Sequence, residues 1–230
     1  MHKLILIETS TALCSAALSE GDRIICERQS TEPRSHASLT AVFVKEMLDQ
    51  AGWKVEDCSA VAVSSGPGSY TGLRVGSSTA KGLCFGAGIP LVAVSTAEVL
   101  FWQAESEGLI PEGCKHVIPM IDARRMEVYT AVFSPKGEMQ SGINAEIVDE
   151  NSYKALLQDG PCLFIGDGAG KCSGTIDSPD ASFIQCCPKA SSLLKPALKA
   201  VEEKRFESTA YFEPFYLKDF VATVSKKKLF

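Results

Sequence analysis

A buried strand, a glycine-rich turn and a helix follow one another directly in the first half of the sequence. Residues 60–64 are apolar and β-branched, as in a strand that is buried on both faces. The turn Ser65-Gly66-Pro67-Gly68-Ser69 follows, and a helical pattern begins at about Gly72. Unpaired backbone N–H groups and the positive end of a helix dipole would meet at this turn. It is therefore a candidate nucleotide or anion loop, formed by Gly66, Gly68, Ser69, Thr71 and Gly72.

The same turn also has a purely structural interpretation. Glycine lets a helix and a strand pack closely, and strand–glycine–helix turns are common. Standard nucleotide motifs are absent from the sequence, because the loop lacks the third glycine of a dinucleotide-binding turn and Gly170-Lys171 is followed by Cys172. An anion loop and a packing turn both remain open on the sequence alone.

Length, composition and charge limit the classes of function. A chain of 230 residues with 45% hydrophobic and 22% charged residues can bury a sizeable core, as one large domain or two small lobes. Its net charge of −5 argues against a protein that binds nucleic acid strongly by itself, because such binding needs clustered Lys and Arg. The basic run Lys226, Lys227 and Lys228 is expected to be a solvated tail.

The cysteines and histidines predict neither a disulfide framework nor a metal site. The nine cysteines lie mostly in apolar runs and form no CxxC pair, which is typical of a reduced, cytoplasmic protein. The first predicted strand starts at Lys3, which leaves no room for a secretory signal, and no apolar run approaches a membrane span. His2, His36 and His116 are isolated, so we expect no metal.

The two halves of the chain open with a similar order of elements. The first half predicts strands at 4–7, 14–19, 23–28, 60–64 and 91–94, with helices at about 37–51, 72–85 and 96–106. The second half predicts strands at 117–121, 126–133, within 138–148, 163–165 and 182–186, with helices at 152–158 and near 191–204, the last kinked or late because of Pro196. Each half begins with a strand, an acid (Glu8 or Asp122) and a hairpin. The pattern predicts a duplicated α/β fold with mixed sheets and helices on their faces.

Several stretches resemble the TsaB (YeaZ) family within the actin-like (ASKHA) ATPase fold, which has two ribonuclease-H-like lobes. They are Ile5-Leu6-Ile7-Glu8-Thr9-Ser10-Thr11, Ser35-His36, residues 65–76 (Ser-Gly-Pro-Gly-Ser-Tyr-Thr-Gly-Leu-Arg-Val-Gly), Ala80-Lys81-Gly82-Leu83, Asp122-Ala123-Arg124-Arg125-Met126-Glu127-Val128-Tyr129 and Pro214-Phe215-Tyr216-Leu217-Lys218. Glu8 stands where the family usually has Asp, and Lys218 where Arg is usual. The resemblance implies a first lobe at 1–104, a smaller second lobe at 105–205, and a segment 206–230 that packs back on the first.

The family resemblance also implies a function. The implied protein is a non-catalytic scaffold in the synthesis of N6-threonylcarbamoyladenosine at position 37 of tRNAs that read ANN codons. Older naming calls such proteins glycoprotease-like. The implied partners are the catalytic paralogue TsaD, which uses an adenylate made by TsaC, and the ATPase TsaE. Alone the protein would form a homodimer, and it would meet tRNA only through the complex. No cofactor would be tightly bound, and a nucleotide would bind only at a partner interface.

The residues themselves argue against independent catalysis. TsaD holds its metal with two histidines four residues apart, and the corresponding positions here are Thr96 and Leu100. Asp122 could be the second carboxylate of a kinase site, but we expect Arg124 and Arg125 beside it to pair with it. A small-molecule kinase or ATPase of the same fold remains the alternative. A peptidase is disfavoured, because no GxSxG or HExxH occurs.

The resemblance places the partner interface on the first-lobe helices at about 37–51 and 72–85. The first helix has more apolar residues than one buried stripe requires, and the second is rich in small residues, as in a helix–helix seam. The predicted contacts are Leu39, Phe43, Val44, Met47, Leu73, Arg74, Ser77 and Ala80. Val44 and Ser77 are expected to be dispensable for the core of their own lobe. The alternative is that all these residues face the sheet.

Overall fold

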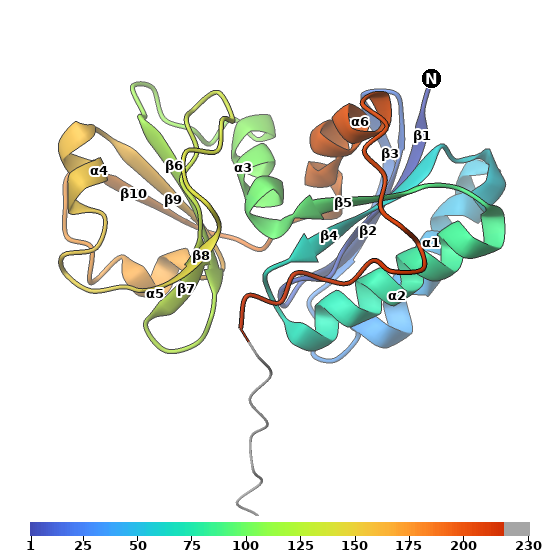
Figure 1. Cartoon of the computed structure of the whole chain (residues 1–230), viewed down its shortest axis with the longest axis horizontal. Coiled ribbons are helices and arrows are strands. Elements are labelled where there is room, and N and C mark those ends of the chain that lie inside the picture. Colours follow the sequence, from blue (N-terminus) through green and yellow to red (C-terminus); the bar gives the residue numbers. More distant parts are fainter. Residues whose placement is uncertain (219–230) are drawn as a thin grey trace, which may run out of the picture.

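The computed structural model describes residues 1–218, in which two α/β lobes lie side by side (Figure 1). The sheet of the first lobe has the order β3-β2-β1-β4-β5. Its strands are β1 (Lys3–Glu8), β2 (Cys14–Glu20), β3 (Arg23–Ser30), β4 (Ala60–Gly66) and β5 (Leu91–Ser95). Each contains the range predicted for it from the sequence. The predicted basic tail, Lys226 to Lys228, lies outside the described residues.

The sheet of the second lobe repeats this order. Its strands are β6 (His116–Asp122), β7 (Glu127–Thr130), β8 (Asn144–Ile147), β9 (Cys162–Gly166) and β10 (Ala181–Gln185), arranged as β10-β9-β6-β7-β8. In both sheets the first strand pairs antiparallel with the second and parallel with the fourth. The predicted duplication is confirmed, and each lobe has ribonuclease-H-like topology.

The helices cover the sheets and begin and end largely where local signals place them. They are α1 (His36–Ala51), α2 (Tyr70–Ala87), α3 (Thr96–Ser106), α4 (Lys154–Asp159), α5 (Ala169–Cys172) and α6 (Leu194–Glu202), with short 3-10 turns η1 (Val55–Asp57) and η2 (Ala190–Leu193). Gly52 ends α1 at φ 66, and Ser95 and Glu98 form a capping box at the start of α3. The last helix starts late, so Pro196 lies in its first turn, where a missing N–H costs little. Helix α5 and turn η1 were not predicted.

Helices from distant parts of the chain complete the two cores. On one face of the first sheet, Leu4 and Leu6 pack against Leu194, Ala197 and Val201, which all belong to α6. On the other face, Ile5 and Ile7 pack with residues of α1 and α2, among them Val44, Met47, Ala80 and Cys84. Helix α3 directs Ala97, Leu100, Phe101 and Ala104 into the second lobe, where they meet Val117 and Leu163. The lobe boundaries at 104/105 and 205/206 stay a prediction. Most of α3 precedes the first boundary but packs in the second lobe, and α6 precedes the second boundary but packs on the first lobe.

Residues 207–218, here called the strap, run back across the first lobe (Figure 1). Glu207 N donates to Leu91 O on the edge strand at 2.9 Å, and Phe215 N donates to Ser65 O at 2.7 Å. Lys81 Nζ donates to the carbonyls of Ala210 and Phe212, at 3.2 and 3.0 Å. Phe212 is buried in the core beside α1 and α2. The strap therefore ties the end of the described chain to β4, β5 and α2.

Within residues 1–218, no helix combines the length and the apolar character that crossing a membrane requires.

Candidate functional site

Acidic side chains come together where the two lobes meet, at the carboxyl ends of the central strands. Glu8 ends β1, Asp122 ends β6, and Asp167 directly follows β9. Because β1 and β4 are parallel, and β6 and β9 are parallel, the ends of each pair lie at one edge of their sheet. We call Glu8, Asp122, Asp167 and Lys171 the interlobe cluster.

Glu8 is the most deeply buried acid of the cluster, with no exposed surface. Its Oε1 accepts a hydrogen bond from Ser10 N at 2.6 Å, whereas its Oε2 has no hydrogen-bond partner in the described part of the chain. Removal from water, with a smaller contribution from the charge of Asp167, raises the pKa of Glu8 to about 7. Glu8 is thus a carboxyl group that changes its charge near neutral pH.

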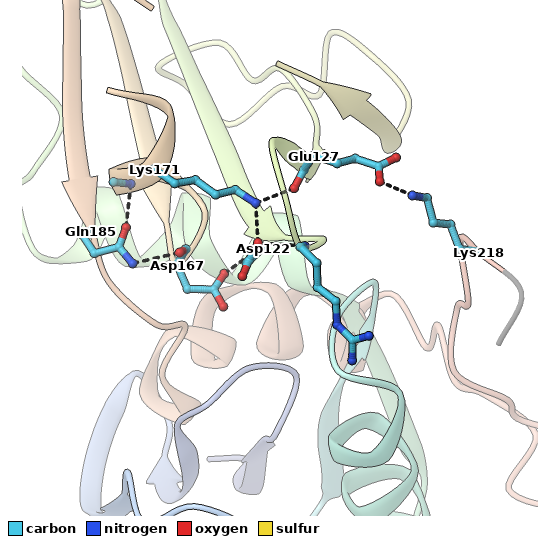
Figure 2. A network of polar contacts seen from close by, with 8 residues as sticks. Asp122, Glu127, Asp167, Lys171, Gln185 and Lys218 are labelled. Atoms are coloured by element: carbon cyan, nitrogen blue, oxygen red, sulfur yellow. Dashed lines mark hydrogen bonds and ion pairs between the residues drawn. The ribbon is translucent and has the colours of Figure 1, made fainter. Parts of the chain in front are cut away.

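Asp167 is held from the second lobe by a network of hydrogen bonds (Figure 2). Its Oδ1 accepts from Asp122 N at 2.9 Å, and its backbone carbonyl accepts from Gln185 Nε2 at 2.8 Å. Gln185 Oε1 in turn accepts from Gly170 N at 2.6 Å. Burial raises the pKa of Asp167 to about 6, so it too favours the protonated form more than a free aspartate does.

Asp122 forms its ion pair with Lys171, which corrects the expected pairing with Arg124 and Arg125. Lys171 Nζ contacts Asp122 Oδ1 and donates to Glu127 O at 2.7 Å (Figure 2). Arg124 reaches Asp122 through its backbone N–H, at 2.9 Å from Oδ1. The reason is geometric: α5 places Lys171 over the end of β6, while the arginines stand on a turn at positive φ.

The cluster does not offer an evident metal centre. Among residues 1–218, no group of three or more His, Cys, Asp or Glu side chains is arranged to hold a metal ion. Thr96 and Leu100, which stand at the positions of the two metal-binding histidines of TsaD, are both fully buried. Leu100 packs in the core of the second lobe. The expectation that the protein works without a metal stays a prediction.

Two glycines of the predicted anion loop, Gly68 and Gly72, lie against the residues that follow β1, and the third, Gly66, lies against the backbone of Phe215 in the strap. A Cβ at Gly72 would lie 2.0 Å from Thr9 O, and one at Gly68 would lie 2.4 Å from Ser10 O. Ser69 N donates to Ser10 O at 2.6 Å, and Ser69 Oγ caps α2 by accepting from Gly72 N at 3.3 Å. Gly66 has a φ of 108°, which glycine adopts without strain. Close packing therefore accounts for these glycines, while anion binding by Ser69 and Thr71 stays a prediction.

Three of the stretches singled out in the sequence meet beside the cluster. Arg74 on α2 donates through Nε to Tyr216 Oη at 3.3 Å, and its guanidinium lies 4.0 Å from the centre of the Tyr70 ring. Lys218, two residues further along the strap, forms an ion pair with Glu127 of β7 (Figure 2). The strap thus joins α2 of the first lobe to the β6–β7 turn of the second.

The predicted partner contacts divide into buried and accessible residues. Five are buried within their own lobe: Val44, Met47, Leu73, Ser77 and Ala80. The expectation that Val44 is dispensable for its own core is wrong, because α1 packs this side chain against the first sheet at 1% exposure. Leu39 and Phe43 are half-buried and Arg74 is exposed. The large apolar side chains that α1 and α2 expose are Val42, at 44%, and Phe85, at 86%, and neither is among the predicted contacts.

Sequence reasoning missed Asp167, Lys171 and Gln185. Residues 166–168 follow the predicted strand at 163–165 and carry no known motif, and Gly170-Lys171-Cys172 departs from a nucleotide-binding motif. The duplication itself carried the missing signal. Since β9 repeats β4, the residues after β9 had to lie at the same edge as Asp122, where a polar loop could contact it.

Comparisons with known proteins agree on one relationship. A family model described as TsaD, tRNA N6-adenosine threonylcarbamoyltransferase, matches residues 27–161. The chain is 29% identical to the tRNA threonylcarbamoyladenosine biosynthesis protein TsaB of Escherichia coli, over 96% of each chain. It is 33% identical to TsaB of Bacillus subtilis, over 71% of this chain and 70% of the relative. The solved structure of YeaZ from Pseudomonas aeruginosa superposes with a TM-score of 0.80 at 29% identity, covering 94% of this chain and 100% of that one.

Proposed function

The chain belongs to the TsaB (YeaZ) family, whose curated members are named for tRNA threonylcarbamoyladenosine biosynthesis, and from this premise we propose that it is a non-catalytic scaffold subunit. In this role it binds and activates the catalytic paralogue TsaD together with the ATPase TsaE. The complex transfers the threonylcarbamoyl group to N6 of adenosine 37 in tRNAs that read ANN codons. The chain contacts tRNA only within that complex, which places it in the cytoplasm.

The pairing of Asp122 with Lys171 is the observation that carries this proposal. A catalytic site of this fold would need a free carboxylate from each lobe, facing substrate and metal. Here the acid at the end of β6 is neutralised by an ammonium group and also accepts the Arg124 N–H. Magnesium binding to Asp122 would have to tolerate the adjacent Lys171 ammonium group, which disfavours metal-dependent phosphoryl transfer.

A reconstitution in which one component at a time is omitted tests the proposal. We expect tRNA modification to require this chain, TsaD, TsaE and the adenylate donor, and to stop when any one is left out. This chain with donor and tRNA alone should give no product. Modified nucleoside formed without TsaD would contradict the non-catalytic role, and full activity without this chain would contradict the scaffold role.

We place the partner surface on the accessible side of α1 and α2, which contact each other along the first lobe. Because Val44 and Met47 are buried, we assign the partner surface to Val42 and Phe85, with the half-buried Leu39 and Phe43. An 86% exposed phenylalanine is unfavourable in water and favours contact with another chain. The same surface would serve a homodimer of the free protein, which TsaD then displaces, since a paralogue can copy a two-fold contact.

The alternative is a small-molecule kinase or ATPase, which the facing carboxyl groups of Glu8 and Asp167 favour. Magnesium-dependent ATP turnover by the purified chain alone would support it. In the scaffold proposal that turnover is absent, no cofactor is tightly bound, and nucleotide binds only when the partner is present. Equilibrium dialysis of labelled ATP with and without TsaD separates the two roles.

A further inference from the structure

Two exposed arginines occupy the tip of the β6–β7 hairpin in a conformation that their residue type disfavours. Arg124 has φ 70 and Arg125 has φ 52, and the turn is closed by Ala123 N to Glu127 O at 3.1 Å. Left-handed backbone costs an L-residue about 1–2 kcal/mol, whereas glycine adopts it freely. A turn selected for folding alone would favour glycine or asparagine here. Strained backbone at these two positions indicates that the arginine side chains have a role that glycine could not fill.

The charges of the two arginines are not balanced by the acids beside them. Asp122 is paired with Lys171 and Glu127 is paired with Lys218 (Figure 2). Within residues 1–218, neither arginine side chain forms an ion pair. On a chain of net charge −5, the hairpin tip is thus a local positive site to which a polyanion would be steered.

A stacking surface lies at the start of α2 and on the strap. The Tyr70 and Tyr216 rings are 4.9 Å apart, and the Arg74 guanidinium lies over Tyr70 at 4.0 Å. The strap connects the two features, because Tyr216 is followed after one residue by Lys218, which holds Glu127 at the base of the hairpin. Two residues of extended chain reach at most about 7 Å. Glu213 is an acidic neighbour of Arg74.

We propose that the hairpin tip, Arg124 and Arg125, with the stacking surface of Tyr70, Arg74 and Tyr216, is where this chain contacts single-stranded RNA. Guanidinium groups bind phosphates, and aromatic rings with guanidinium planes stack on unpaired bases. The combination suits a loop of tRNA better than a duplex, whose bases are already stacked. This inference rests on the proposed function, since tRNA reaches the site only within the complex.

The test uses the full chain assembled with TsaD and measures tRNA affinity as a function of salt. The variant Arg124→Gly/Arg125→Gly removes both charges and relieves the backbone, so its unfolding midpoint should not fall. We expect its tRNA Kd to rise about tenfold at physiological salt, and the slope of log K against log salt to fall by about 1.4, as for two lost contacts to a single strand. Arg124→Lys/Arg125→Lys should retain most of the slope.

Arg23→Ala/Lys115→Ala is the matched control, because it removes two exposed cations at the opposite ends of the two sheets. It should leave Kd and slope unchanged. Unchanged tRNA binding by the glycine variant, or an equal loss in the control, would overturn the proposal. Lost ATP affinity with intact tRNA binding would also overturn it, since the arginines would then serve a nucleotide. Failure of the wild-type complex to modify tRNA would instead contradict the proposed function.

Discussion

Lys171 on α5 neutralises Asp122 at the end of β6, although two arginines follow Asp122 almost directly in the sequence. The arginines are thereby left exposed on their hairpin, and the acid is neutralised by Lys171. The ion pair between Lys171 and Asp122 thus gives the acid and the two arginines of this turn different proposed roles. The acid supports the turn, and the arginines face the partner molecule.

Asp122→Asn tests whether this acid is catalytic. Because Asp122 is committed to Lys171, we expect the reconstituted complex to lose less than about threefold in kcat, against the 10²-fold or greater loss typical of a catalytic acid or base. Stability should change by less than about 1 kcal/mol, since the Asp122 side chain is 44% exposed and the pair is screened by water. A loss of 10²-fold with unchanged assembly would favour the kinase-like alternative.

Glu8 should make the stability of the protein depend on pH. Its pKa is raised from 4.5 to about 7 by folding, so the folded state holds a proton that the unfolded state releases. The free energy of unfolding should therefore fall as the pH rises from about 4.5 to about 7, and stay level above. The loss is at most about 3 kcal/mol.

Urea unfolding of the wild type and of Glu8→Gln at pH 5 and pH 8 measures this contribution. The variant should lose less stability between the two pH values, while the contribution of Asp167 remains in both proteins. Glu56→Gln, at an exposed position of η1, is the control and should behave as the wild type. Identical pH dependence in all three proteins would refute the assignment to Glu8.

Gly72→Ala should damage folding, because its Cβ would lie 2.0 Å from the carbonyl oxygen of Thr9. Backbone on both sides cannot move apart easily, so we expect a loss of roughly 3 kcal/mol in the free energy of unfolding. Gly82→Ala, in the same helix with nothing within 4 Å, should instead gain up to about 1 kcal/mol. Chemical denaturation compares the two. Equal effects would mean that close packing is not what requires glycine at position 72.

Phe85→Glu should weaken the complex with TsaD without unfolding the chain. Phe85 is 86% exposed, so its replacement leaves the core intact, whereas a buried charge at a partner contact costs several kcal/mol. We expect at least a 10²-fold rise in Kd by calorimetry, and loss of the homodimer by light scattering. Val42→Glu should act in the same direction.

Ile147→Glu provides the control, since this residue is 73% exposed and lies on β8 of the second lobe, where it pairs with Glu127, and not on α1 or α2. It should bind TsaD as the wild type does. If Ile147→Glu weakens the complex and Phe85→Glu does not, the partner surface lies on the second lobe.

The fold could be predicted because its signals are local and occur twice. Apolar runs such as residues 4–7 and 60–64 mark strands buried on both faces, and Gly52 or Ser95 with Glu98 marks where helices end and begin. A repeated order of elements then gives the duplication. Helix α5 has four residues, too few for a periodic pattern to emerge.

The site was harder to predict because it depends on contacts between distant segments. Arg124 and Arg125 are nearest to Asp122 along the chain, yet the distant Lys171 forms the ion pair, because α5 lies over the end of β6. In α1, apolar residues on several sides suggested an exposed seam, but Val44 and Met47 both face the first sheet. Periodicity shows that a helix is apolar on several sides, and only the neighbouring elements decide which side is covered.

The exchange of helices between the lobes has a consequence for synthesis on the ribosome. The first sheet is complete once β5 has emerged, but one of its faces stays bare until Leu194, Ala197 and Val201 follow. At roughly 5–20 residues per second, that wait lasts on the order of 5–20 seconds. During this interval Leu4, Leu6 and Val92 would be open to chaperones, and the nascent first lobe could not mature ahead of the second. The two lobes should therefore acquire their native form together, and only after α6 has been synthesised.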